Sequence, residues 1–389
     1  MRSAELFDTE LTPDQLSFRD DVRALLRSPE VQDEVARILS RPEGEEPGLL
    51  GAFRLLGERG WLAPGWPRRF GGLGFGHAEC AIVTEEMILA GLPDDAHVLS
   101  IDIVGKFIEH CGTDRQRERF LPPLARGEMI ATVLLTEPGC GSDLSRMQTR
   151  AAAEGGGWRL HGTKVYSQKS GFGDVALCAA VTTPGPTAIG GVTLFLLPLR
   201  APGVTIRNVP NLTYDAFCEI SIDGVLLTRD DVLGEVDDGW RLLDEMLVYE
   251  RTGIDYHAKT RRWLDSAVAA AGGRAALDPL LGARLEQIEA RLAAAHALAW
   301  QVVAGLDRGR PDPVGAAMAK WYATEQARDV ARFCLDLHGR EGLLAPWDPS
   351  VAPPAPVDTA LRHAPTVTMS AGTSEVMLHI IASTHLELL

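Results

Sequence analysis

The hydrophobic pattern of this chain changes character twice, near residue 131 and near residue 238. Outside these points apolar residues recur at helical spacing, in long stretches rich in leucine and alanine. Between them lie short, often β-branched runs separated by glycine, proline and asparagine, which is typical of an antiparallel sheet or barrel. We therefore predict a helical domain over 1–130, a β domain over 131–237 and a helical bundle over 238–389.

Local signals refine this division. Thr12 and Pro13 suit the N-cap and the first position of a helix. The segment 60–76 is rich in glycine, proline and tryptophan, and predicts a structured loop between helices. Near the other end, the proline-rich segment 345–358 predicts a loop, and 374–389 predicts a final helix.

Composition excludes several classes of protein. The chain has 389 residues, 46% of them hydrophobic and 23% charged, with a formal net charge of −15. Nucleic acids and anionic membrane surfaces require clustered positive charge, so neither is expected as a partner. No apolar run approaches the roughly 20 residues of a membrane helix, and the first residues are too polar for a signal peptide. The cysteines lack metal-ligand spacing, so we expect no metal, and a cytoplasmic location.

Three motifs follow one another over this architecture. Residues 136–143 read TEPGCGSD, residues 162–168 read GTKVYSQ, and residues 371–376 read AGTSEV. In this order they resemble the acyl-CoA dehydrogenase family, and shorter matches extend the resemblance over nearly the whole chain. The resemblance implies an α+β fold in which an N-terminal helical domain, a central β-barrel or sheet domain and a C-terminal four-helix bundle follow one another.

The resemblance also implies an FAD cofactor. The residues carried over as FAD contacts lie in the three motifs and in two bundle segments: Leu135, Thr136, Gly141, Ser142, Tyr166, Ser167, Gln168, Arg274, Gly339, Gly342 and Thr373. Glycines in such a loop let main-chain N–H groups approach a cofactor closely. Arg274 is carried over as an arginine that reaches the FAD of a neighbouring subunit.

Three residues depart from the family pattern. Tyr166 stands where tryptophan usually packs beside the flavin, and it keeps a flat aromatic surface. Gln168 stands where threonine or serine usually donates to flavin N5, and Arg340 replaces a glycine. Gly339 and Gly342 are equally compatible with ordinary helix C-caps.

The position of the catalytic base is unusual. Many relatives carry a glutamate just before the C-terminal Gly-Thr, where this chain has Ala371. Isovaleryl-CoA, long-chain and some bacterial steroid side-chain enzymes instead carry it on a bundle helix, in a context that Glu250-Arg251 matches. The resemblance therefore implies Glu250 as base, the main-chain N–H of Ala371 as donor to the thioester carbonyl, and Arg251 and Gly372 as substrate contacts.

Two other interpretations of these residues stay open. Glu250 and Arg251 also suit an ordinary ion pair on a helix surface. His257, expected on the same helix as Glu250 and on the same face, is the spare base.

The function implied is dehydrogenation of an acyl thioester carried by CoA or by an acyl carrier protein. Glu250 would remove the α proton while hydride leaves the β carbon for flavin N5, and electrons would pass to an electron-transfer flavoprotein. A homodimer or homotetramer is implied, and the pattern favours branched, polycyclic or specialised-metabolite acyl groups.

Two other functions remain open. One is an oxygen-using flavin monooxygenase on the same fold, which needs no glutamate base. The other is a non-catalytic subunit that completes the FAD site of a partner.

Overall fold

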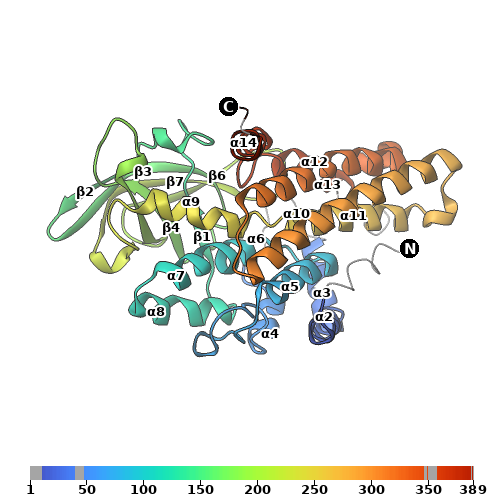
Figure 1. Ribbon diagram of the computed structural model, residues 1–389, viewed down its shortest axis with the longest axis horizontal. Helices are drawn as coiled ribbons and strands as arrows, with labels where there is room; N and C mark the ends of the chain where they lie inside the picture. The colour runs from blue at the N-terminus through green and yellow to red at the C-terminus, as the bar shows by residue number, and fades with distance from the viewer. Residues whose placement is uncertain (1–10, 40–47, 346–347, 349–356, 387, 389) are drawn as a thin grey trace.

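The computed structural model describes residues 11–39, 48–345, 348, 357–386 and 388; the side chains of Leu247, Val248 and Glu250 are also outside the described part. The predicted order of helices, sheet and helices is confirmed (Figure 1). Most of the proline-rich segment 345–358 lies outside the described residues.

The N-terminal region is helical. Its elements are α2 (Pro13–Leu26), α3 (Pro29–Leu39), α4 (Gly51–Gly57), η1 (Arg68–Phe70), α5 (His77–Ala90), α6 (Asp95–His97), η2 (Val98–Gly105), α7 (Lys106–Cys111) and α8 (Asp114–Ala125). The predicted start of α2 is confirmed, because Thr12 accepts a hydrogen bond from the N–H of Gln15 and the Gln15 side chain accepts one from the N–H of Thr12. The segment η2 is π-helical.

The central region forms one sheet. Its strands are β1 (Ala131–Leu134), β2 (Arg150–Glu154), β3 (Gly157–Gln168), β4 (Val175–Val181), β5 (Val192–Pro198), β6 (Val204–Val209), β7 (Phe217–Leu227) and β8 (Val232–Leu233). In the described residues they lie in the order β6-β7-β3-β2-β4-β5-β8, with β1 beside β4. The predicted antiparallel pairing holds for most of the sheet, but β4 runs parallel to both β1 and β2.

Burial explains how the sheet is held. Every residue of β4 is buried, as expected of a strand covered on both faces. One face packs against the N-terminal helices in a core that includes Leu177, Leu194 and Val104. The strand β2 has no β-branched residue and escapes sequence analysis, but it pairs with β3 through a turn at Gly155 and Gly156.

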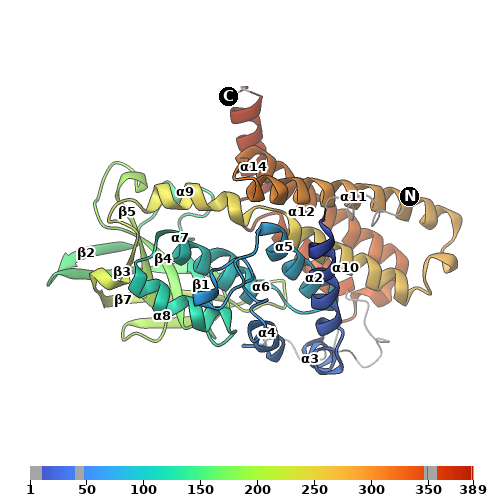
Figure 2. The same cartoon turned by 60° about the horizontal axis from the view of Figure 1, so that its bottom comes forward.

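The C-terminal region contains α9 (Gly239–Glu250), α10 (Ile254–Ala270), η6 (Arg274–Ala276), α11 (Pro279–Asp307), α12 (Pro313–His338), η7 (Gly339–Leu343), α13 (Val357–Val367), α14 (Ser374–Ile380) and η8 (Ile381–His385). Helices α10, α11, α12 and α13 pack as a bundle with an alanine-rich core. Helix α9 instead lies along the sheet, where Leu242 and Met246 join the core of the N-terminal helices, and α14 projects from the bundle (Figure 2).

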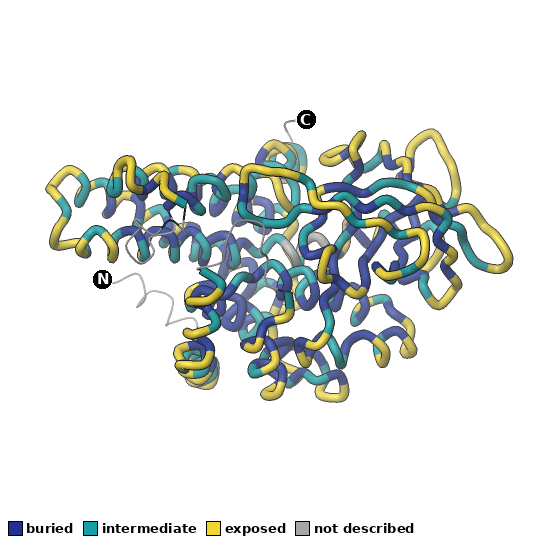
Figure 3. Tube along the Cα trace, turned by 180° about the vertical axis from the view of Figure 1, so that it is seen from behind, coloured by how far each residue is buried: buried dark blue, intermediate teal, exposed yellow. Residues whose placement is uncertain are grey.

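Helix α5 joins the two helical regions. Ala78, Ala81 and Ile82 pack against Ile254 of α10 and Val303 of α11. The interior of the sheet and bundle is buried, while the loops at both ends of the molecule are exposed (Figure 3). No helix in the described ranges combines the length and the apolar character that a bilayer-spanning segment needs.

Candidate active site

The loop after β1 presents main chain to the surface. Glu137 and Cys140 exchange two main-chain hydrogen bonds, which close a tight turn, and Pro138 through Asp143 follow with most residues exposed. A Cβ on Gly139 would meet no described atom within 4 Å, and one on Gly141 only a methyl of Thr136 at 3.8 Å. Packing within the described chain therefore does not explain these glycines, and the loop is open to a group from outside.

A buried ion pair anchors this loop to the sheet. The Lys164 ammonium, fully buried, donates to a Glu137 carboxylate oxygen at 2.9 Å and to the Leu135 carbonyl at 3.1 Å. Burial alone would raise the pKa of Glu137, but Lys164 and hydrogen bonds from Thr149 and Gln148 lower it. Sequence analysis missed this pair, although both residues lie in motifs that it used.

Tyr166 is turned out of the sheet beside this loop. The β3–β7 pairing is irregular between Lys164 and Ser167, and Tyr166 adopts a positive φ of 60° there. Its side chain is 61% exposed, while the neighbouring Val165 N–H bonds to the Thr136 carbonyl. A bulge at this position aims a flat aromatic side chain at the surface next to the open loop.

Ser167 and Gln168 face differently from Tyr166. The Ser167 hydroxyl donates to the Val133 carbonyl and contacts the Thr132 and Ser170 hydroxyls, all inside the sheet. The Ser167 side chain is therefore engaged inside the sheet, and the residue itself pairs with Cys218 of β7. Gln168 is half-buried, and its carbonyl accepts from Thr132.

Two cations hold the segment before α14. Arg251 Nε donates to the Ala371 carbonyl at 3.0 Å, and Lys320 Nζ donates to the Gly372 carbonyl at 2.7 Å. Ala371 and Gly372 have positive φ values of 53° and 98°. The φ of Gly372 favours glycine, and a Cβ there would also lie 2.7 Å from Met377 Cε, at the flexible end of that side chain. The N–H of Ala371 makes no hydrogen bond to any described residue.

The expectation that Glu250 and His257 share one helix is wrong. Helix α9 ends at Glu250, and α10 begins only after Gly253, whose φ of 84° breaks the helical path. The side chain of Glu250 lies outside the described part, but its main chain immediately precedes Arg251, which binds Ala371.

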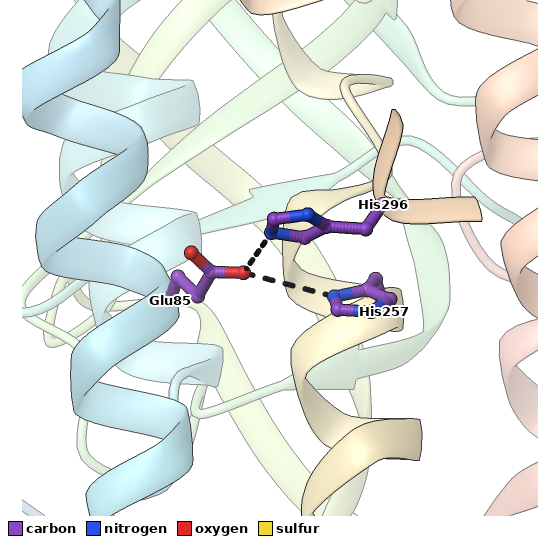
Figure 4. Close-up of side chains that lie close together, drawn as sticks. All are labelled: Glu85, His257 and His296. Atoms are coloured by element: carbon purple, nitrogen blue, oxygen red, sulfur yellow. Dashed lines mark hydrogen bonds and ion pairs between the residues drawn. The ribbon is translucent and has the colours of Figure 1, made fainter. Parts of the chain in front are cut away.

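His257 faces away from this break, into the packing between helices. Figure 4 shows Glu85 of α5 between His257 of α10 and His296 of α11. A Glu85 carboxylate oxygen lies 2.7 Å from His296 Nε2 and 3.7 Å from His257 Nδ1. Burial raises and the two histidines lower the pKa of Glu85, with a net decrease, while burial lowers the pKa of His257. His257 is therefore part of a buried contact between helices.

A cavity of about 80 Å³ borders the α9–α10 turn. Tyr249 and Thr252, which flank Glu250 and Arg251, line one side. Helix α5, the segment η2 and residues 62–66 line the others, and His77 stacks on Tyr249 with ring centroids 5.7 Å apart. The turn that carries Glu250 thus closes a partly enclosed space between the N-terminal helices and the bundle.

The remaining predicted contacts lie elsewhere. Arg274 forms an ion pair with Glu289 at the α10–α11 turn, and Gly339 ends α12 nearby, at the end of the bundle away from the sheet (Figure 1). Gly342 is buried, and a Cβ there would lie 2.9 Å from Val357. The Thr373 hydroxyl caps α14. Within one chain, therefore, Arg274, Gly339 and Gly342 do not reach the loop after β1.

Family models match almost the whole chain. The N-terminal, middle and C-terminal domain models of acyl-CoA dehydrogenases match residues 12–128, 132–225 and 237–386. Family members are flavoproteins that oxidise acyl thioesters.

Individual proteins match over most of their length. Acyl-CoA dehydrogenase IpdE1 of Mycobacterium tuberculosis is 30% identical over 75% of this chain and 76% of its own. Acyl-CoA dehydrogenase FadE26 of the same organism is 27% identical over 95% and 96%. A solved structure, the Tcur3481-Tcur3483 steroid ACAD, superimposes with a TM-score of 0.87 at 26% identity, covering 97% of this chain and 98% of that one. The chain belongs to the acyl-CoA dehydrogenase family.

Proposed function

We propose that this chain is an FAD-dependent acyl-thioester dehydrogenase whose base is Glu250. Glu250 would remove the proton α to the thioester carbonyl, and the N–H of Ala371 would donate to that carbonyl as negative charge develops on its oxygen. The observation that supports this most is the hydrogen bond from Arg251 to the Ala371 carbonyl, at 3.0 Å. It ties the residue after Glu250 to the main-chain donor, so both groups can act on one substrate.

The loop and bulge fit a flavin. Gly139 and Gly141 leave open space over the main chain, and Tyr166 offers an exposed ring beside them. Leu135, Thr136, Gly141, Ser142 and Gln168 would complete the cradle, as would the main chain of Ser167. When bound, FAD would accept the hydride that leaves the β carbon of the substrate.

The hydrogen bonds to the segment before α14 suggest that Arg251 and Lys320 position the main chain and take no part in proton transfer. Each donates to a carbonyl in the segment, which fixes the direction of the adjacent N–H groups. Fixed main-chain donors stabilise developing charge without reorganisation during the reaction. Arg251 and Gly372 also border the space where we propose the thioester lies.

A second copy of the chain would complete the FAD site. Arg274 lies in η6, after α10, and Gly339 and Gly342 lie in η7, after α12; both helices run away from the sheet (Figure 1), as they would if these segments reached the cofactor of a neighbouring subunit. We propose a homodimer or homotetramer, a CoA or acyl-carrier-protein thioester as substrate, and an electron-transfer flavoprotein as acceptor.

The test is anaerobic bleaching of the flavin by acyl thioesters in Glu250→Gln and Glu245→Gln. The first variant removes the proposed base and should bleach about a hundredfold more slowly or worse, because a positioned base contributes roughly that much. The second removes an exposed carboxylate from the same helix and should bleach like the parent.

Three outcomes would redirect the proposal. Equal bleaching in both variants would exclude Glu250 as base. Rapid reoxidation of the reduced flavin by oxygen with an oxygenated product would favour a monooxygenase. A purified chain that is colourless and gains FAD only with a different partner would favour the non-catalytic subunit.

A further inference from the structure

The cavity beside the α9–α10 turn contains an unpartnered buried nitrogen. His97 Nε2 lies 2.8 Å from the Leu62 carbonyl, which only accepts hydrogen bonds, so this nitrogen carries the hydrogen. In the neutral ring the other nitrogen, Nδ1, is then an acceptor. It has no hydrogen-bond partner among the described residues, although His97 is only 2% exposed and lines the cavity. Buried polar atoms of this kind normally have a partner.

A carboxylate faces the same space. Asp102 Oδ2 lies 3.6 Å from His97 Nδ1, too far for a direct hydrogen bond. Asp102 lines the cavity and its side chain keeps 29% of its surface accessible. Burial raises the pKa of Asp102, and His97 and Lys106 offset this only in part. Asp102 and His97 thus face one space, in which Thr84 donates to Asp102 and His97 Nδ1 has no hydrogen-bond partner among the described residues.

The charge around the cavity favours a cationic or neutral donor. Asp102 and Asp255 contribute carboxylates, and Lys106 contributes an ammonium that it shares with Glu109, at 3.2 Å. Burial and then Lys106 lower the pKa of His77, so that ring adds no positive charge at neutral pH. The lining therefore carries more negative than positive charge.

One side of the cavity is closely packed. Leu62 and Trp66 are both 2% exposed and line the cavity. Trp66 packs directly on the main chain of Gly105 in η2, because a Cβ there would lie 2.3 Å from the indole ring. The π-helical form of η2, common at functional sites, spans both Asp102 and Gly105. Leu62, Trp66 and the main chain of η2 therefore form a packed wall on this side of the cavity.

We propose that the substrate is a compact acyl thioester whose far end carries a hydrogen-bond donor, best a protonated amine, that Asp102 and His97 recognise together. This inference rests on the proposed function, because the thioester end must lie at the α9–α10 turn. Asp102 and His97 select the substrate and take no part in proton removal. Because Asp102 and His97 are polar, the cavity would favour an acyl group with a hydrogen-bond donor over a purely hydrocarbon one.

Three CoA thioesters of the same ring size test this. They are cyclohexanecarbonyl-CoA, its tetrahydropyran analogue with oxygen opposite the carboxyl-bearing carbon, and its piperidine analogue with a protonated nitrogen there. The first offers no hydrogen bond, the second only accepts and the third donates. We expect kcat/KM for the piperidine thioester to exceed both others by about tenfold or more, the effect of one charge-assisted hydrogen bond.

Variants localise the effect. Asp102→Asn, which keeps the size of the side chain, should remove most of the advantage of the piperidine thioester while the chain stays yellow. Asp114→Asn on α8 removes an exposed carboxylate and should leave the ranking unchanged.

The outcomes separate this inference from the proposed function. Faster turnover of the cyclohexane thioester, or turnover of straight-chain acyl-CoAs when no ring thioester reacts, would overturn the recognition pair while leaving the dehydrogenase intact. A ranking that Asp102→Asn does not change would also overturn it. Failure of every acyl thioester to bleach a flavin-loaded chain would instead remove the proposed function and, with it, this inference.

Discussion

Lys320 is a fully buried cation whose role is local. Its ammonium donates to the Gly372 carbonyl at 2.7 Å and to the Val367 carbonyl at 3.2 Å, and lies 5.6 Å from the centre of the Tyr256 ring. Ala371, next to this anchor, keeps a left-handed backbone that costs a non-glycine residue about 1–2 kcal/mol. Arg251 on the Ala371 carbonyl and Lys320 on the Gly372 carbonyl anchor two successive peptide groups and hold that conformation.

We expect Lys320→Met to loosen this segment while preserving the volume of the side chain. The Gly372 and Val367 carbonyls would lose their donor, at a cost of about 1–3 kcal/mol in unfolding free energy. Misdirection of the Ala371 N–H should lower kcat/KM by about a hundredfold, as loss of a fixed donor does. Thermal melting and steady-state kinetics measure the two effects.

Arg332→Met is the matched control. It removes an exposed cation from the same helix and should change neither quantity. A Lys320→Met chain with unchanged kcat/KM would show that the segment before α14 keeps the orientation of the Ala371 N–H without Lys320.

The sequence predicts some of these residues and misses others for a physical reason. Arg251 was found because it follows Glu250 in a motif. Lys320 lies in one of the shorter matching segments, but its role was not found, because its bond to Gly372 spans 52 residues. A contact of that range depends on how α12 packs against the segment before α14, which local patterns do not encode.

The stability of the contact between α5, α10 and α11 depends on the protonation states of Glu85 and His257. Trp300 Nε1 lies 2.9 Å from His296 Nε2, and Glu85 lies between His296 and His257. The folded chain keeps His257 neutral, because burial lowers its pKa below 6.5, and keeps Glu85 ionised, because the two histidines lower its pKa below 4.5.

The chain should therefore lose stability on acidification. Below pH 6.5 the unfolded chain binds a proton at His257 that the folded chain does not, and below pH 4.5 the same holds for Glu85. We expect His257→Gln to have a shallower fall in melting temperature between pH 7 and pH 5 than the parent. The difference corresponds to about 1.4 kcal/mol per pH unit at most, the limit for one proton.

His379→Gln serves for comparison, since His379 is exposed on α14. Its melting profile should follow that of the parent. Identical profiles for His257→Gln and the parent would mean that the acid sensitivity arises elsewhere.

Elements were predicted well where one pattern dominated. The start of α2 followed from Thr12 and Pro13, and the β-branched runs gave β3 to β7. The break between α9 and α10 was missed because only residues 251–253 separate the two helices, and Gly253, with its positive φ, directly precedes α10. The parallel pairing of β1 with β4 was missed because pairing partners are not a local property.

At the scale of the whole molecule, the predicted FAD contacts divide into two groups. The β1 loop and Tyr166 lie at the sheet, whereas Arg274, Gly339 and Gly342 lie at the far end of the bundle. The order of the domains follows from the sequence, but the separation of these groups does not, since it depends on the direction of the long helices α10, α11 and α12.

We expect Arg274→Ala to weaken retention of the FAD bound by the neighbouring subunit, without changing the assembly itself. The variant should fold normally and lose FAD about tenfold more readily on filtration, the effect of one lost charge-assisted hydrogen bond. Its oligomeric state, measured by light scattering, should match that of the parent.

Arg308→Ala, at the opposite end of α11, should retain FAD like the parent. If Arg274→Ala retained FAD equally well, the contact from a neighbouring subunit would be excluded.

Helix α5 serves two purposes at once. Cys80 and Thr84 line the cavity, while Glu85 and Ile82 hold the bundle against the N-terminal helices. Substitutions in α5 that change substrate choice would therefore risk weakening the packing between the N-terminal helices and the bundle. Residues 62–66 border the same cavity, but Leu62 and Trp66 belong to the core of the N-terminal helices, so changes there would also cost stability.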